Sequence, residues 1–306
     1  MKKPLLGGSN LAAPKPQKNW DWRAASNFIA GGAGGALLFF ASIGGFEPAL
    51  TRMAILFALI LIGCGLTCVW FEIGRPLRAM NVYRHFATSW MTREAFVALA
   101  VFAAGGLAWL LFQPLLALLA GIAGLAFLYS QARILAANKG IPAWRHPRSV
   151  SLMVTTGLAE GAGFLACVAS LSGASISFWH ALALLALIAI RAFVWKGYLA
   201  GLTADGAPEG ALRVLNGIAP RLAMFGHLLP GLAVAAALAG MPGRDALMFA
   251  AGIMVVAGGW FLKYTLVRRA AFTQGLAVVR LPTRGGGPAG PAVKPGWKTV
   301  PGAKAG

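Results

Sequence analysis

Long apolar runs separated by short polar stretches make up most of this chain. A helix needs about 20 apolar residues to cross the hydrocarbon core of a bilayer. Runs of that length lie at residues 25–46, 50–72, 94–112, 114–136, 150–171, 175–196, 221–240 and 245–267. The pattern therefore predicts an all-α, polytopic integral membrane protein whose eight transmembrane helices form a bundle.

The two ends of the chain differ in character from its apolar middle. Residues 1–24 predict a basic cytoplasmic segment, which lacks the apolar core of a secretory signal. Residues 25–268 predict the eight-helix membrane domain. Residues 269–306 are basic and rich in Gly and Pro, a composition typical of a disordered tail.

The composition agrees with a membrane location. Of the 306 residues, 58% are hydrophobic and 11% are charged, and the mean hydropathy is +0.71. Soluble globular domains carry about 25% charged residues. This chain has too little charge to cover the surface of a soluble domain, which excludes an ordinary soluble enzyme, a disordered chain and a coiled coil.

The basic residues are distributed unevenly between the two sides of the membrane. The chain has 27 Lys and Arg against 8 Asp and Glu. In the eight-span arrangement all the basic residues except Arg52 and Arg244 fall on the side of the termini, including Arg191 and Lys263. Because cytoplasmic loops carry an excess of Lys and Arg, both termini are predicted to be cytoplasmic, with the protein in the inner (cytoplasmic) membrane. The charge thus reflects topology and contact with membrane lipid, and it does not indicate a nucleic-acid partner.

Metal ligands are not arranged as a site. The three cysteines lie in apolar runs without a CxxC motif, and the four histidines are not paired within helices at one depth. We therefore expect no zinc site, iron–sulfur cluster or haem bound by this chain.

Ionisable groups inside membrane spans are costly and point to function. Glu160 lies near the middle of the fifth span, where it has either a proton-linked or quinone-linked role or a buried interhelical hydrogen bond. Glu72 and Glu94 lie at span ends beside arginines, and for Glu94 we favour an interface ion pair. Further polar residues in the cytoplasmic halves of the spans are Asn27, Tyr129, Arg133, His227, Lys263 and Tyr264.

These polar residues share one depth, which favours a pocket entered from the lipid near the cytoplasmic face. For Arg133 and Lys263 the alternative is that the long side chain reaches back to the interface. For Tyr264 the alternative is anchoring at the interface.

The loop after the second span resembles a signature of the membrane anchor subunits of dimethyl sulfoxide reductase and its relatives. The matching residues are Gly74, Pro76, Arg78, Ala79, Ser89, Trp90 and Glu94. Two more matches are YSQARILAANKGIPAW at 129–144 and TGLAEGAG at 156–163, the latter similar to polysulfide and nitrite reductase membrane subunits. The opening QKNWDWRAASNFIAGGAGG is similar to the membrane subunit of phenylacetyl-CoA:acceptor oxidoreductases.

The resemblance implies a haem-free anchor that binds menaquinone or ubiquinone. It implies two partners, a four-cluster iron–sulfur subunit and a molybdopterin catalytic subunit. The candidate quinone ligands are Asn27, Tyr129 and Arg133, with Glu72, which stands where the family has a histidine, relaying protons. The candidate partner-docking loop carries Arg75, Arg78, Arg84 and His85, although ordinary positive-inside charge explains any single arginine equally well.

The predicted function is electron transfer between the membrane quinone pool and the iron–sulfur subunit. A partner docked on a cytoplasmic loop implies a cytoplasmic substrate, such as an aryl-acetyl-CoA, and the chain itself carries no catalytic residue for that substrate. Two alternatives remain. One is a proton- or ion-translocating respiratory subunit that uses Glu160, and the other is a secondary transporter without a redox partner.

Overall fold

The computed structural model describes residues 13–73 and 81–275, and these residues form helices joined by short loops. Eight helices are long and apolar enough to cross a membrane, which confirms the predicted fold class. In chain order they are Trp22–Ile43 (α2, η1 and α3), Pro48–Glu72 (α4), Trp90–Leu111 (α5), Pro114–Ala137 (α6), Arg148–Leu171 (α8), Phe178–Ala204 (α9), Glu209–Leu238 (α10, η3 and α11) and Arg244–Arg269 (α12 and η4).

Most predicted spans agree with these helices to within a few residues, but the sixth and seventh do not. Helix α9 continues to Ala204, and the seventh span begins with α10 (Glu209–Arg221), well before residue 221. Helix α10 buries Ala211, Leu215 and Ile218 along one stripe, and its other positions include Glu209, Arg213, Asn216 and Arg221. A search for apolar runs misses such an amphipathic extension, because the helix continues beyond the part that hydrocarbon requires.

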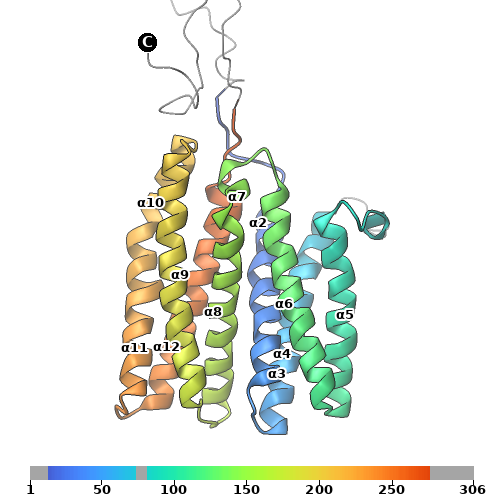
Figure 1. Cartoon of the computed structure of the whole chain (residues 1–306), viewed down its shortest axis with the longest axis vertical. Helices are drawn as coiled ribbons and strands as arrows, with labels where there is room; N and C mark the ends of the chain where they lie inside the picture. The colour runs from blue at the N-terminus through green and yellow to red at the C-terminus, as the bar shows by residue number, and fades with distance from the viewer. Residues whose placement is uncertain (1–12, 74–80, 276–306) are drawn as a thin grey trace, which may run out of the picture.

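The eight helices form two groups of four (Figure 1). The first half consists of α2 to α6 and the second of α8 to α12, with the short helix α7 (Pro142–Arg145) between them. Helix α3 (Gly32–Ile43) packs against both α6 and α8, and so it joins the halves. Because each half has four spans, both halves begin on the same side of the membrane.

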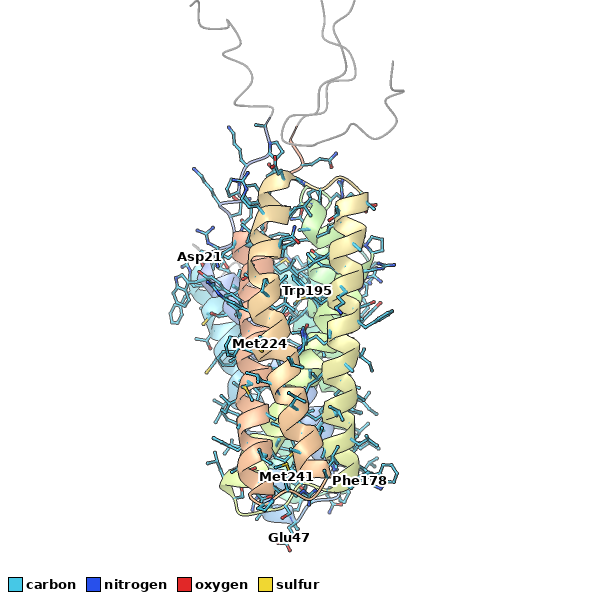
Figure 2. The ribbon with its side chains drawn as sticks, turned by 90° about the vertical axis from the view of Figure 1, so that its left-hand side faces the viewer. Asp21, Glu47, Phe178, Trp195, Met224 and Met241 are labelled. Atoms are coloured by element: carbon cyan, nitrogen blue, oxygen red, sulfur yellow. The ribbon has the colours of Figure 1, made fainter. Side chains whose placement is uncertain are left out.

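The same side of the bundle carries both ends of the described chain, and we call it the terminal face (Figure 1). Figure 2 shows Asp21 toward this face, and Glu47, Phe178 and Met241 at the opposite one. Beyond the helices on the terminal face, the main chains of residues 15–17 and 271–273 pair. The N–H of Gln17 donates to the carbonyl of Ala271 over 2.8 Å, and the N–H of Thr273 donates to the carbonyl of Lys15 over 2.8 Å.

Both halves use a pair of glycines to bring their first and fourth helices into backbone contact. A Cβ at Gly35 or Gly124 would collide with the carbonyl of the other residue. Gly163 and Gly252 approach each other in the same way between α8 and α12 (Arg244–Tyr264). The two glycines of a pair are equally far apart in sequence in both halves. Small residues permit such close packing in lipid, where helices gain little from hydrophobic burial.

A buried ion pair joins the first and fourth helices of the second half. The Nζ of Lys263 in α12 donates to Oε2 of Glu160 in α8 over 2.5 Å, and both side chains are 0% exposed. Lys263 therefore does not reach back to the interface. Arg191 is also fully buried, in the middle of α9, so these two cations are wrongly counted among the charges that set topology.

We expect Lys263→Met to destabilise the protein by about 3–5 kcal/mol, because it leaves the carboxylate of Glu160 buried without its cation. The double variant Glu160→Gln, Lys263→Met removes both charges and should recover most of that loss. Thermal unfolding in detergent measures both, with Lys139→Met, at an exposed loop position, as the control. Equal destabilisation by the single and double variants would contradict this account of the pair.

Candidate functional site

Three buried polar side chains from three helices meet in the first half, toward the terminal face. The Nδ2 of Asn27 donates to Oε1 of Glu94 over 3.2 Å. The Nε2 of Gln131 donates to the backbone carbonyl of Asn27 over 2.9 Å. All three are buried, and so the carboxylate of Glu94 lies among amides, away from water.

The local backbone explains why these groups meet. Asn27 begins η1 (Asn27–Gly31), a π-helical stretch in which the regular i→i−4 ladder is interrupted. Within this widened turn the carbonyl of Asn27 accepts from Nε2 of Gln131. Close packing of α4 leaves little room here: a Cβ at Gly65 would lie 3.2 Å from Oδ1 of Asn27. The wide turn and the glycine together position the amide of Asn27 toward Glu94.

Two cavities share Glu94 in their walls. One, of about 300 Å³, lies between α2 (Trp22–Ser26), α4 and α5 and is lined by Asn27 and Glu72 as well. The other, of about 470 Å³, lies between α4 and α5. Their shared wall consists of Val69, Ile73, Met91 and Glu94. We call the two together the Glu94 pocket.

The Glu94 pocket suits a neutral, lipophilic ligand with a carbonyl or hydroxyl head. Its walls are mostly apolar, and a few convergent polar groups are typical of a binding site. The carboxylate of Glu94 can accept a proton, and Oδ1 of Asn27 has no partner among the described residues. The described residues place no arginine against Glu94, whose expected interface ion pair is not seen among them, and its hydrogen-bond donor there is the amide of Asn27.

A surface ion pair borders this pocket. Asp21 precedes α2 and accepts from Arg23, whose Nη2 lies 2.8 Å from its Oδ2. These hydrogen bonds hold the pKa of Asp21 below its usual range, so the carboxylate stays ionised. The Nη1 of Arg23 also donates to the carbonyl of Phe71 over 2.6 Å, which ties α2 to the end of α4 beside Glu72.

The structure brings together only part of the predicted quinone site. Asn27 and Glu72 line the Glu94 pocket. Tyr129 and Arg133 do not: the Nη1 of Arg133 donates to the Tyr129 hydroxyl over 3.0 Å, and its guanidinium lies 4.7 Å from the Trp90 ring centroid. Tyr129 is exposed there, so these two side chains belong to the outer surface of the bundle.

The predicted docking loop is only partly described. Arg84 and His85 are exposed at the terminal face, just before α5. Arg75 and Arg78 lie outside the described residues. The exposed pair is therefore available to a partner on the same side as the Glu94 pocket.

From Gln131, buried polar groups continue into the second half. A Cβ at Gly32 would lie 2.8 Å from Nζ of Lys263 and 3.2 Å from Oε1 of Gln131, so this glycine separates the two groups. Lys263 then donates to Glu160. Polar atoms without a partner among the described residues are found in Asn27, Gln131, Thr156, Glu160, Trp260 and Thr265. We call the row Glu94, Asn27, Gln131, Lys263 and Glu160 the polar seam.

A second buried polar cluster lies between α9 and η3 (Leu222–Leu228). The Nε of Arg191 donates to Nε2 of His227 over 3.2 Å, and its Nη1 donates to the carbonyl of Val255 over 3.0 Å. Its Nη2 donates to the carbonyl of Gly226, within the π-helical stretch. The guanidinium thus satisfies a carbonyl in η3 while it holds His227 in place.

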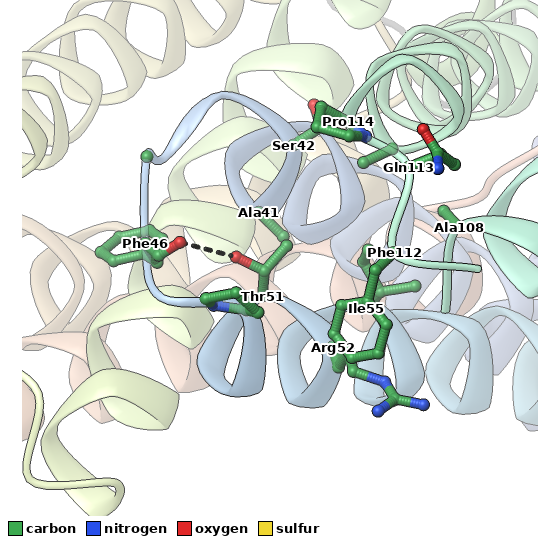
Figure 3. Close-up of a pocket in the computed structure, with 13 residues that line it drawn as sticks. Ala41, Ser42, Phe46, Thr51, Arg52, Ile55, Ala108, Phe112, Gln113 and Pro114 are labelled. Atoms are coloured by element: carbon green, nitrogen blue, oxygen red, sulfur yellow. Dashed lines mark hydrogen bonds between the residues drawn. The ribbon is translucent and has the colours of Figure 1, made fainter. Parts of the chain in front are cut away.

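A further cavity, of about 270 Å³, lies at the opposite face (Figure 3). Its lining residues come from α3 to α6 and include Thr51, Phe112 and Arg52 but no carboxylate. The guanidinium of Arg52 lies 3.8 Å from the Phe112 ring centroid. Without a group that can take up a proton, this cavity suits proton-coupled redox chemistry less well than the Glu94 pocket.

Sequence reasoning missed two central residues. Gln131 lies inside the segment YSQAR, where a neutral amide interrupts an apolar run. Arg191 stands five residues before Lys196, and from sequence alone both are charges at the end of the sixth span. For Arg191 the signal was a charged residue flanked by apolar residues on both sides, and for Gln131 it was an amide within a predicted span, both of which indicate a buried partner.

Comparison with known proteins identifies the family. The model of the DMSO reductase anchor subunit (DmsC) family matches residues 33–204, more than half of the chain, including Glu94, Gln131 and Glu160. A sulfite dehydrogenase subunit of Allochromatium vinosum is 35% identical over 125 residues, an alignment that covers 35% of this chain and 38% of that protein. The chain thus matches well under half the length of this relative. The family match confirms the resemblance seen in the loop after the second span: the chain belongs to the DMSO reductase anchor subunit family.

Proposed function

We propose that this chain is the quinone-reactive membrane anchor of a molybdopterin oxidoreductase complex. The observation that carries the proposal is a buried carboxylate, Glu94, with an amide donor from Asn27 in the wall of mostly apolar cavities. The family description supports the anchoring role. The cavity chemistry supports a menaquinone or ubiquinone head group as the ligand.

The residues of the pocket have different roles in the proposed proton-coupled electron transfer. A bound quinone supplies the two-electron, two-proton chemistry. Glu94 accepts a proton from, or returns one to, the head group, and Asn27 holds the carboxylate in position by its Nδ2 hydrogen bond. Glu72 stands nearer the end of α4 and exchanges protons with the terminal face. The apolar walls of the Glu94 pocket keep bulk water away from the head group and Glu94 while the proton is transferred.

The polar seam gives Glu160 a proton-linked role in the same reaction. In the seam, acceptor atoms of Asn27, Gln131 and Glu160 have no partner among the described residues. The ammonium of Lys263 has three N–H groups and uses one for Glu160. Buried polar atoms of this kind are commonly satisfied by internal water. Water in the seam connects Glu94 to Glu160 and lets a proton pass between the halves.

The partners dock on the terminal face. The loop with Arg84 and His85, close to the Glu94 pocket, binds the four-cluster iron–sulfur subunit, and the molybdopterin subunit lies beyond it. The concentration of basic residues at this face supports its cytoplasmic placement in the inner membrane. Electrons then pass between the pocket and the nearest cluster of the partner.

Two substrates are candidates for the catalytic partner. The resemblance of the opening segment to phenylacetyl-CoA:acceptor oxidoreductases favours an aryl-acetyl-CoA. The similarity to a sulfite dehydrogenase subunit favours sulfite instead. The anchor contributes no residue to that reaction, so the co-purifying catalytic subunit decides between them.

Purification of the tagged protein from its native membrane in mild detergent tests the proposal. We expect stoichiometric molybdenum or tungsten, iron in the amount of several clusters, a bound quinone and two co-eluting subunits by mass spectrometry. A lone protein without metals after gentle extraction would contradict the anchor role and favour a transporter.

We expect Glu94→Gln to lower quinol-dependent electron transfer by about 100-fold, because the amide keeps the shape of the side chain but cannot take up a proton. The measurement is the rate of cluster reduction by a short-chain quinol in the purified complex. The control is Glu47→Gln, an exposed carboxylate on the opposite face. An unchanged rate in the Glu94 variant would remove Glu94 from the reaction.

We expect Gly32→Ala to slow the same reaction several-fold, because the added methyl group fills the space between Lys263 and Gln131. The change removes no ionisable group, and the flexible end of Lys263, 2.8 Å from the new Cβ, can shift to keep the fold. Gly63→Ala is the matched control, since its Cβ would meet only Phe102, at 3.7 Å. Equal rates in the two variants would show that the polar seam does not carry protons.

A further inference from the structure

The two halves carry similar cavities between equivalent helices. In the first half, the cavity of about 470 Å³ lies between the second and third spans, α4 and α5. In the second half, a cavity of about 500 Å³ lies between its second and third spans, α9 and the helix formed by η3 and α11 (Leu229–Leu238). Each has mostly apolar walls and one buried ionisable group, Glu94 in the first and His227 in the second.

Local sequence explains the second cavity. Small residues face it from both helices, namely Ala189, Ala192, Ala219, Ala223 and Gly231. The backbone widens into η3 just after Pro220, which cannot donate a main-chain hydrogen bond. Ala189 and Leu228 are exposed at its edge, so the cavity opens on the outer surface of the bundle, where lipid lies.

Arg191 fixes the protonation of His227. A guanidinium only donates hydrogen bonds, so the Nε2 that accepts from Arg191 carries no hydrogen. The proton of the neutral imidazole is therefore on Nδ1, which has no hydrogen-bond partner among the described residues. His227 is 9% exposed and lines the cavity, so it presents one N–H donor to an otherwise mostly apolar space.

The depth of the His227 side chain in the membrane limits which ligands can bind beside it. Arg191 and His227 lie well inside their spans, with Arg191 near the middle of α9. A phosphate or carboxylate head would be costly at that depth, whereas a neutral carbonyl is not. Lys196, toward the terminal face, adds a second donor to the lining. The ligand is thus a neutral lipophile with a hydrogen-bond-accepting head.

We propose that this cavity is a second quinone site, in which Nδ1 of His227 donates to a carbonyl of the head group. The isoprenoid tail leaves between α9 and α11 into the lipid. The choice of a quinone among neutral lipophiles rests on the proposed function, which places this chain in contact with the quinone pool.

The second site differs chemically from the Glu94 pocket. The lining contains no carboxylate, and the free nitrogen of His227 already carries a proton. His227 can therefore donate to a carbonyl oxygen but cannot take a proton from a quinol while Arg191 occupies Nε2. The site holds the oxidised quinone in preference to the quinol, and it serves binding and not turnover.

The test is the number of quinones bound per chain in the whole purified complex, titrated with oxidised decylubiquinone. We expect two in the wild type and one in Gly231→Leu. A Cβ at Gly231 would meet only Ile188 and Leu185, each at 3.9 Å, so the backbone accepts a side chain at this position in the cavity wall. Gly106→Leu is the matched control and should retain two, because a Cβ there meets no atom within 4 Å.

Other outcomes separate this inference from the proposed function. Two bound quinones in Gly231→Leu, or a phospholipid in the cavity that decylubiquinone does not displace, would overturn the second site. Ala98→Leu narrows the Glu94 pocket and should leave one quinone bound. If the wild type binds one quinone that Gly231→Leu removes and Ala98→Leu does not, the second site stands and the proposed function fails.

Discussion

A polar group inside the hydrocarbon of a membrane must find its partner within the protein. In this bundle the partners of the buried charged and amide side chains come from neighbouring helices of the same half. Glu160 needs Lys263, and the row of amides from Gln131 to Asn27 leads to Glu94. Glycines beside these side chains, such as Gly32, Gly65 and Gly259, leave room for them between the helices. The residues that hold the bundle together are thus also the ones suited to proton transfer.

The two halves share a plan and differ in their chemistry. Each crosses its first and fourth helices at a glycine pair and leaves a cavity between its second and third. The first half places a carboxylate beside its cavity, and the second places a histidine held by an arginine. A carboxylate can gain and lose a proton in place, whereas the bonded imidazole is fixed as a donor. Under the proposed function, one architecture supports quinone turnover in the first half, and the proposed second site adds quinone binding in the other.

The sequence predicted the spans well because hydrocarbon thickness imposes a length on them. It predicted less of the site, because an apolar run shows that a helix is buried in lipid without showing which side faces a neighbour. Asn27 and Glu72 line the pocket, while Tyr129 and Arg133, one turn apart on α6, face outward. Lys263 was expected at the interface because its partner lies 103 residues away in sequence, beyond the reach of local patterns. Arg191 was missed for the same reason, since its contacts come from other spans.

The positions of Glu160 and Lys263 along the chain determine when their ion pair can form during synthesis. Because the carboxylate precedes its cation by 103 residues, α8 is made before α12 exists. At about 5–20 residues per second, translation leaves Glu160 without its partner on the order of 5–20 s. The final span then supplies the cation, and the residues just beyond it pair with residues 15–17. A chain that stops before α12 leaves Glu160 in the membrane domain without the cation that pairs with it in the full bundle.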